Sequence, residues 1–145
     1  MVALMGRAIP ARQFLLHRDR SYARPLFFCR EIDGVTDEAQ TIDVVLSRRL
    51  VDVPPAMRSI RLADCLNGVL DSLPDDVVIR DFDVLFNPAY KVDVVQLLAD
   101  AYRRHRFDLV WPGGFDRKQT LTYAEEGYPD YRTYDIRRYD ITCVY

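Results

Sequence analysis

Apolar residues in this chain recur at two different spacings, and each spacing predicts a type of element. Two segments, Leu62–Leu73 and Asp93–Arg103, carry apolar residues three and four positions apart, which is the spacing of one helix face. Pro74 follows the first segment, and a basic cluster at 103–106 ends the second, where positive charge suits the helix dipole. We therefore expect two amphipathic helices. Their buried faces should include Leu66, Val69, Leu70, Leu97 and Leu98.

Compact apolar segments bounded by turn residues predict the strands. The expected strands are Gln13–His17, Thr41–Leu46, Val77–Asp81 and Phe107–Trp111, and a last apolar run, Ile141–Tyr145, can add a final strand. The segment Ser21–Ile32 stays open between helix and strand. Pro25 suits the first turn of a helix, whereas the four apolar residues after it suit a strand equally well.

Strands and helices alternate along almost the whole chain, a pattern typical of βαβ units. The sequence therefore predicts the α/β class, as a three-layer sandwich with a mainly parallel sheet and helices on both faces. A length of 145 residues suits one domain. We accordingly expect a single domain over residues 1–145, laid out like a small P-loop NTPase.

Composition narrows the setting in which the protein works. Hydrophobic residues make up 49% of the chain and charged residues 29%, as expected of a folded globular protein. The formal net charge of −2 gives no global positive field to attract nucleic acid. The three cysteines lie far apart without a C-x-x-C pair, which fits a reducing cytoplasm better than a disulfide framework or a zinc site. The sequence offers neither a secretory signal nor a membrane-spanning run, so we expect a cytoplasmic protein with no membrane partner.

The sequence lacks the motif that gives P-loop NTPases their name. In those proteins the loop after the first strand reads G-x-x-x-x-G-K-[ST], because glycines let backbone N–H groups approach the phosphates and the lysine neutralises them. No such string occurs here, and the loop after the first expected strand, residues 17–24, contains neither glycine nor lysine. We expect a degenerate phosphate loop at 17–24 and no cofactor, with ATP and Mg²⁺ as the alternative.

Three segments nevertheless carry a recognisable pattern: LSRRLVDVPPAMRSIRLADCL (Leu46–Leu66), DVLFNPAYKVDVVQLLADA (Asp83–Ala101) and LTYAEEGYPDYRTY (Leu121–Tyr134). They resemble BrxF, the family of small P-loop proteins of type 3 BREX phage-defence systems. The resemblance covers roughly Gln13 to Asp135 in the same order, and the last segment is its most specific part. It implies a small nucleotide-binding-type fold that serves a multi-protein system restricting bacteriophage DNA.

Few residues of the family's nucleotide site can be carried over to this chain. Arg24 is a candidate to meet a phosphate as a lone cation, although a surface arginine with no such role is the simpler reading. Asp81 and Asp83 follow an apolar strand, where an NTPase organises Mg²⁺, and Asp83 is also a candidate nucleotide contact. On the family pattern, however, the first acidic position falls on Arg80, which would repel a metal. The alternative is that both carboxylates cap a strand end beside Arg80.

Tyrosines gather in the C-terminal segment 121–145, which holds six of the nine in the chain, interleaved with arginines. Such a pattern can stack on single-stranded bases, form a protein-binding face, or pack a weakly apolar tail onto the domain. Neighbouring carboxylates would repel phosphates, so we favour protein contact. The candidate partner-binding residues are Tyr123, Glu125, Tyr131 and Arg132.

Three hypotheses about function follow. The first is a non-hydrolysing scaffold, a BrxF-like subunit that binds other proteins of a phage-defence system. The second is a divergent nucleotide-binding ATPase or nucleic-acid-processing enzyme that uses Asp81 and Asp83. The third is an α/β domain of unrelated function. The sequence leaves open a homo-oligomer and contact with nucleic acid through partners.

Overall fold

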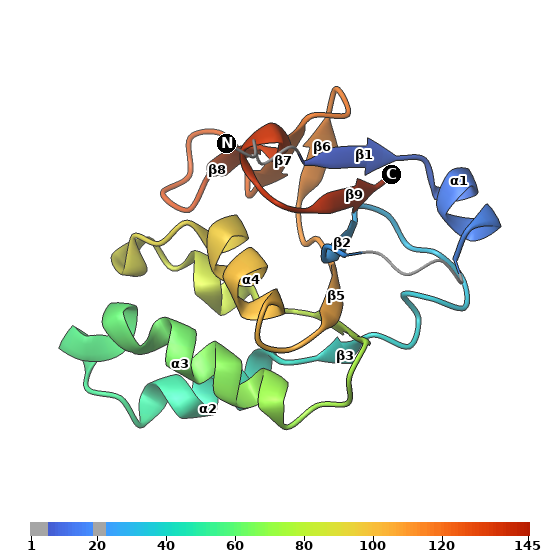
Figure 1. Cartoon of the computed structure of the whole chain (residues 1–145). Helices are drawn as coiled ribbons and strands as arrows, with labels where there is room; N and C mark the ends of the chain where they lie inside the picture. The colour runs from blue at the N-terminus through green and yellow to red at the C-terminus, as the bar shows by residue number, and fades with distance from the viewer. Residues whose placement is uncertain (1–5, 19–22) are drawn as a thin grey trace, which may run out of the picture.

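The computed structural model describes residues 6–18 and 23–145 (Figure 1). The α-helices are α1 (Ala11–Leu16), α2 (Asp43–Val51), α3 (Arg58–Asp71) and α4 (Val94–Tyr102). The strands are β1 (Arg7–Ile9), β2 (Leu26–Phe28), β3 (Gln40–Thr41), β4 (Val77–Arg80), β5 (Phe107–Val110), β6 (Gly114–Asp116), β7 (Thr120–Tyr123), β8 (Arg132–Asp135) and β9 (Thr142–Val144). Short 3₁₀ helices are η1 (Pro55–Met57), η2 (Asp83–Phe86), η3 (Pro88–Tyr90) and η4 (Ile136–Arg138).

The described strands form two sheets. The larger has six strands in the order β1-β9-β2-β5-β4-β3, and all its neighbours pair in parallel. The smaller is an antiparallel sheet of β6, β7 and β8, inserted between β5 and β9. Because the six strands are parallel, their carboxyl ends meet at one edge of the large sheet. The α/β class with a mainly parallel sheet is thus confirmed.

The two faces of the large sheet are covered unequally. Side chains of α2, α3 and α4 pack with Phe27, Ile79 and Leu109 into the main core. On the other face, Ala11 and Phe14 of α1 pack with Leu26, Phe28 and Val144 in a second, smaller cluster. Figure 1 shows α2, α3 and α4 together and α1 by itself on the far side. Among the described residues, three helices therefore cover one face, and one helix of six residues covers part of the other.

The periodicity of α3 and α4 is borne out by their burial. Leu66, Val69, Leu70 and Leu98 are buried, as expected, whereas Leu97 is only partly buried at the edge of the core. Asp93 caps the start of α4, because its carboxylate accepts a hydrogen bond of 3.1 Å from the backbone N–H of Gln96, an otherwise unpaired donor. No helix in the described ranges is long and apolar enough to cross a membrane.

Two of the expected strands are wrong. Gln13–His17 lies in α1 and the turn after it, because Ala11 and Phe14, three positions apart, both face the sheet. In Thr41–Leu46, only Thr41 belongs to a strand, and α2 begins at Asp43. Its buried residues Leu46 and Leu50 lie four apart, so tertiary burial outweighs the β-branched propensity of the segment.

The other strand predictions agree with the structure. Val77–Asp81 contains β4, Phe107–Trp111 contains β5, and Ile141–Tyr145 contains β9. The open segment Ser21–Ile32 contains a strand, β2, whose three residues are all buried in the middle of the large sheet. A continuous apolar strand in that position is typical of a parallel sheet covered on both faces.

Candidate functional site at the carboxyl edge of the parallel sheet

Ligands of open α/β sheets bind at the carboxyl ends of the strands, because the loops that follow parallel strands converge there. In this chain the edge is formed by residues 29–39 after β2, 81–86 after β4 and 111–113 after β5. The antiparallel sheet adjoins it, since the Trp111 indole N–H donates to the carbonyl of Thr122 in β7 at 2.9 Å. The carboxyl edge is therefore the candidate site.

The centre of the edge holds an ion pair between Arg80, the last residue of β4, and Glu31, which follows β2. The guanidinium donates two hydrogen bonds of 2.9 Å to the two carboxylate oxygens of Glu31. It donates a third, of 2.6 Å, to the carbonyl of Thr36. The hydrogen bonds from Arg80 hold the pKa of Glu31 below its ordinary value, and the same contacts raise the pKa of Arg80. Both groups are therefore charged at neutral pH, and Arg80 binds Glu31 in the bidentate geometry that favours carboxylate or phosphate.

The segment after β2 is folded onto itself. The buried Thr36 hydroxyl accepts the backbone N–H of Ile32 at 2.8 Å and donates to Glu31. The N–H groups of Val35 and Thr36 both donate to the Ile32 carbonyl, at 3.0 and 2.9 Å. A phosphate loop instead needs several N–H groups free to converge on an anion. Here these N–H groups are already bonded within the chain.

Asp81 and Asp83 lie at the end of β4, as the sequence predicts, but in different surroundings. Asp81 is exposed and has a left-handed backbone with φ of 61°. Asp83 is the first residue of η2, and its carboxylate accepts a hydrogen bond of 2.9 Å from the Tyr123 hydroxyl. Burial and the neighbouring Asp83 raise the pKa of Tyr123, so the phenol stays a donor at neutral pH. Asp83 therefore anchors β7 to the edge of the large sheet.

The fit of this edge to a metal ion is poor. Within residues 6–18 and 23–145, no three His, Cys, Asp or Glu side chains gather closely enough to hold one. Arg80 lies beside Asp81 and contributes a positive charge, and Asp83 already binds Tyr123. A metal role for the two carboxylates remains a prediction from the sequence.

An aromatic cluster fastens the antiparallel sheet to this edge. The ring of Tyr123 stacks on Phe86 of η2 with centroids 3.6 Å apart, and Phe86 meets Trp111 edge to face. Gly113 completes the contact, since a Cβ atom there would lie 1.8 Å from the Thr122 carbonyl oxygen. Glycine is therefore required after β5 so that β7 can approach, which explains its place without invoking a nucleotide.

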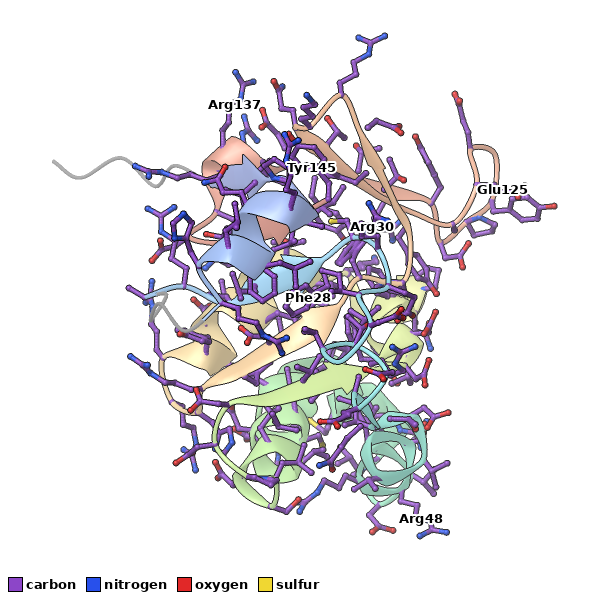
Figure 2. The ribbon with its side chains drawn as sticks, turned by 90° about the vertical axis from the view of Figure 1, so that its right-hand side faces the viewer. Phe28, Arg30, Arg48, Glu125, Arg137 and Tyr145 are labelled. Atoms are coloured by element: carbon purple, nitrogen blue, oxygen red, sulfur yellow. The ribbon has the colours of Figure 1, made fainter. Side chains whose placement is uncertain are left out.

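The four candidate partner-binding residues lie on one hairpin, formed by β7, β8 and the loop 124–131. Glu125 is exposed and points away from the domain (Figure 2). Arg132 stabilises the loop of the hairpin, because its guanidinium donates to the carbonyls of Pro129 and Tyr131 at 3.2 and 2.8 Å. Tyr131 is partly buried. The most exposed aromatic ring of the hairpin loop belongs to Tyr128, at 62%.

Arg24 lies at the opposite edge of the sheet from Asp83. It precedes β2 and forms an ion pair of 2.7 Å with Asp140, which precedes β9. The structure therefore does not bring together the two candidate nucleotide contacts. The expected phosphate loop at 17–24 follows a helix and leads into the amino end of β2, and its residues 19–22 lie outside the described part of the chain.

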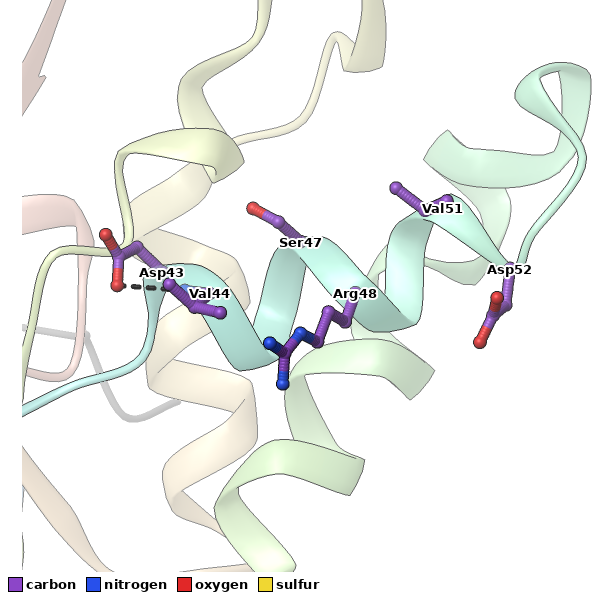
Figure 3. Close-up of a pocket in the computed structure, with 6 residues that line it drawn as sticks. All are labelled: Asp43, Val44, Ser47, Arg48, Val51 and Asp52. Atoms are coloured by element: carbon purple, nitrogen blue, oxygen red, sulfur yellow. Dashed lines mark hydrogen bonds between the residues drawn. The ribbon is translucent and has the colours of Figure 1, made fainter.

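A pocket separate from the carboxyl edge lies on the outer side of α2. A shallow pocket of about 550 Å³ is lined by Val44, Val51 and Ser47, with Asp43, Arg48 and Asp52 at its rim (Figure 3). Val44 is 54% and Val51 70% exposed. An apolar strip with a charged rim resembles a protein-contact surface more than a small-molecule site, because few polar groups converge in it.

Sequence reasoning missed two features of the edge. The Glu31–Arg80 pair joins residues 49 positions apart, and no local pattern signals it. Tyr128 could have been found, since an aromatic residue between Gly127 and Pro129 is expected at the tip of a turn. Comparisons of the chain with family models, with curated proteins and with solved structures found no match.

Proposed function

We propose that this protein is a non-hydrolysing scaffold, a BrxF-like subunit that binds other proteins of a bacterial BREX anti-phage defence system. Its fold is a P-loop-type sheet in which the nucleotide edge has become structural. The sequence resemblance supplies the biological setting. The contacts at the carboxyl edge supply the argument against nucleotide turnover.

The strand order supports a P-loop-type ancestry. Numbered from β2 along the chain, the strands β2, β3, β4, β5 and β9 lie in the spatial order fifth, first, fourth, third, second. This is the order of many P-loop NTPases, with β1 as an addition at one edge. In that frame the first strand is β2, so the phosphate-loop position corresponds to residues 29–39 rather than 17–24.

The observation that carries the proposal is the bidentate Arg80–Glu31 pair with its bond to Thr36. A triphosphate must be desolvated on binding, and P-loops offset that cost with converging N–H groups, a lysine and Mg²⁺. Here the segment after β2 contains no lysine, and the Glu31 carboxylate of this segment already binds the Arg80 guanidinium. Nucleotide binding at this edge would require that pair to break.

The hairpin 120–135 supports a role in protein contact. It is anchored to the domain through Tyr123, Phe86 and Asp83, while the loop 124–129 is exposed. An exposed tyrosine on a hairpin that is anchored in this way suits recognition, because Tyr contributes a large contact area at low entropic cost. Carboxylates at 125, 126 and 130 disfavour a nucleic-acid backbone.

Calorimetric titration with ATP and Mg²⁺ at physiological salt tests the loss of nucleotide function. We expect no saturable binding and no hydrolysis. A dissociation constant in the low micromolar range, lost in Asp83→Asn and kept in Arg106→Gln, would instead support the divergent ATPase that uses Asp81 and Asp83. The second variant distinguishes binding at this edge from binding elsewhere on the chain.

Co-expression with the proteins encoded beside its gene tests the partner role, with a methyltransferase, a phosphatase-like protein and a large ATPase as the expected neighbours. We expect one of them to co-purify with the chain. Tyr128→Ala and Tyr131→Ala should weaken this capture, whereas Leu16→Ala, at a 74% exposed site on α1, should not. Capture that survives both tyrosine variants would exclude the hairpin as the contact surface.

A further inference from the structure

The sparsely covered face of the large sheet contains a cavity of about 360 Å³, which we call the open-face cavity. It lies over β2, β4 and β5, beside the single helix α1. Of the described residues, three arginines line it: Arg18 after α1, Arg24 before β2 and Arg106 before β5. Asp108 of β5 contributes a carboxylate. None of these groups belongs to the carboxyl edge described above.

The cavity follows from the alternation of side chains along the strands. Phe107 and Leu109 of β5 belong to the core under the helices, so Asp108 faces the opposite side. On that side α1 packs only on part of the sheet, through Phe14, which meets Phe28 edge to face with ring centroids 5.3 Å apart. Within the described residues, the cavity lies beside this contact, and its lining combines aromatic side chains such as Phe14 and Phe28 with charged groups.

The Asp108 carboxylate is partly buried at the cavity. The backbone N–H of Leu26 donates to one carboxylate oxygen at 2.9 Å, and burial raises the pKa of the side chain to about 6. An ionisable group placed in a strand at a cavity, with a perturbed pKa, is a frequent mark of a binding site. It provides an acceptor for a ligand N–H or O–H.

The arginines provide the complementary charge. Arg24 already binds Asp140, and Arg18 donates to the Gly34 carbonyl at 3.3 Å. Arg106 lines the cavity and is exposed. A second hollow of about 320 Å³ shares Arg106 with the open-face cavity and adds Arg103 to its lining. Guanidinium groups in this number suit a phosphate, which accepts bidentate bonds from them.

We propose that the open-face cavity binds a small organic phosphate, with the phosphate at Arg106 and Arg18 and an apolar, ring-shaped body against Phe28. A volume near 360 Å³ lies in the range of small-molecule sites. Asp76 and Asp108 in the lining disfavour a long polyanion, so a small ligand suits the cavity better than a nucleic-acid strand. This site is independent of the scaffold role and would work with or without it.

Titration with phenyl phosphate, followed by NMR of the backbone amides at fixed ionic strength, tests the proposal. Phenol and inorganic phosphate serve as the two separate halves of the probe. We expect saturable binding of phenyl phosphate, shifts centred on Leu26 and Asp108, and weaker binding of each half. Arg106→Gln and Arg18→Gln should each weaken binding about tenfold, as expected for the loss of one charge-assisted contact.

Arg48→Gln, at an exposed arginine of α2, is the matched control and should bind as the unaltered protein does. Equal binding of phenol and phenyl phosphate, or equal losses in all three arginine variants, would overturn the proposal. So would a single-stranded oligonucleotide that binds through Arg106 while phenyl phosphate does not bind. All these substitutions are at exposed positions, so the fold should survive them, which circular dichroism verifies.

Discussion

At the scale of single residues, several charged groups at the carboxyl edge are bound to identified partners. Arg80 and Glu31 neutralise each other at the carboxyl edge, and Asp83 holds Tyr123. Asp108 differs, because its only hydrogen bond in the described part of the chain is the one from Leu26. Burying a carboxylate with so little compensation costs free energy when it is ionised.

Asp108 should therefore make stability depend on pH. Its pKa rises from 3.8 to about 6 on folding, so between these values the folded state binds more protons than the unfolded state. The free energy of unfolding should fall as pH rises through this window and stay lower above it, by about 3 kcal/mol at most. Asp108→Asn keeps an acceptor for the Leu26 N–H and removes the titration.

Urea denaturation of both proteins at pH 4 and pH 7.5 measures the effect. The free energy of unfolding of Asp108→Asn, taken relative to that of the unaltered protein, should be about 2–3 kcal/mol higher at pH 7.5 than at pH 4. Gln13→Ala, at an exposed position without an ionisable group, should show no such change. If the substitution changes the free energy of unfolding by the same amount at both pH values, folding does not raise the pKa of the Asp108 carboxyl group.

At the scale of elements, burial explains which predicted helices and strands exist. The faces of α3 and α4 repeat over three turns or nearly so, and their periodicity was readable. Helix α1 has six residues, too few for a clear period. Helix α2 has nine, as α4 has, but its exposed face also carries the apolar residues Val44, Val45 and Val51, which obscure the period. Their apolar residues resemble a strand locally, and only contact with the sheet selects the helix.

The burial of α3 predicts the result of truncating its side chains. Leu66 is fully buried in the main core, so Leu66→Ala should lower the free energy of unfolding by about 2–5 kcal/mol. Leu97→Ala should cost less, because its side chain is only partly buried. Leu16→Ala, at a 74% exposed site, should change stability by less than about 0.5 kcal/mol. Equal losses at Leu66 and Leu16 in chemical denaturation would contradict the packing described.

At the scale of the whole molecule, the sheet divides the surface into regions with different chemistry. The carboxyl edge is closed by an ion pair and an aromatic cluster. The hairpin loop 124–131 extends from that edge, and the open-face cavity with its arginines lies beside α1. The proposed partner-binding hairpin and the proposed ligand cavity therefore lie on separate surfaces, and variants such as Tyr128→Ala and Arg106→Gln can distinguish the two proposals.

The sequence by itself determined the α/β class, the helices α3 and α4, the strands β4, β5 and β9, and the lack of a glycine-rich loop. These depend on local spacing and residue type, which the chain order preserves. Only the tertiary structure decided that α1 and α2 are helices, that Glu31 meets Arg80, and that Arg24 and Asp83 lie at opposite edges. The physical reason is that strand order in a parallel sheet, and the contacts between distant side chains that it creates, are fixed by burial of the whole chain and leave no periodic trace in any one segment.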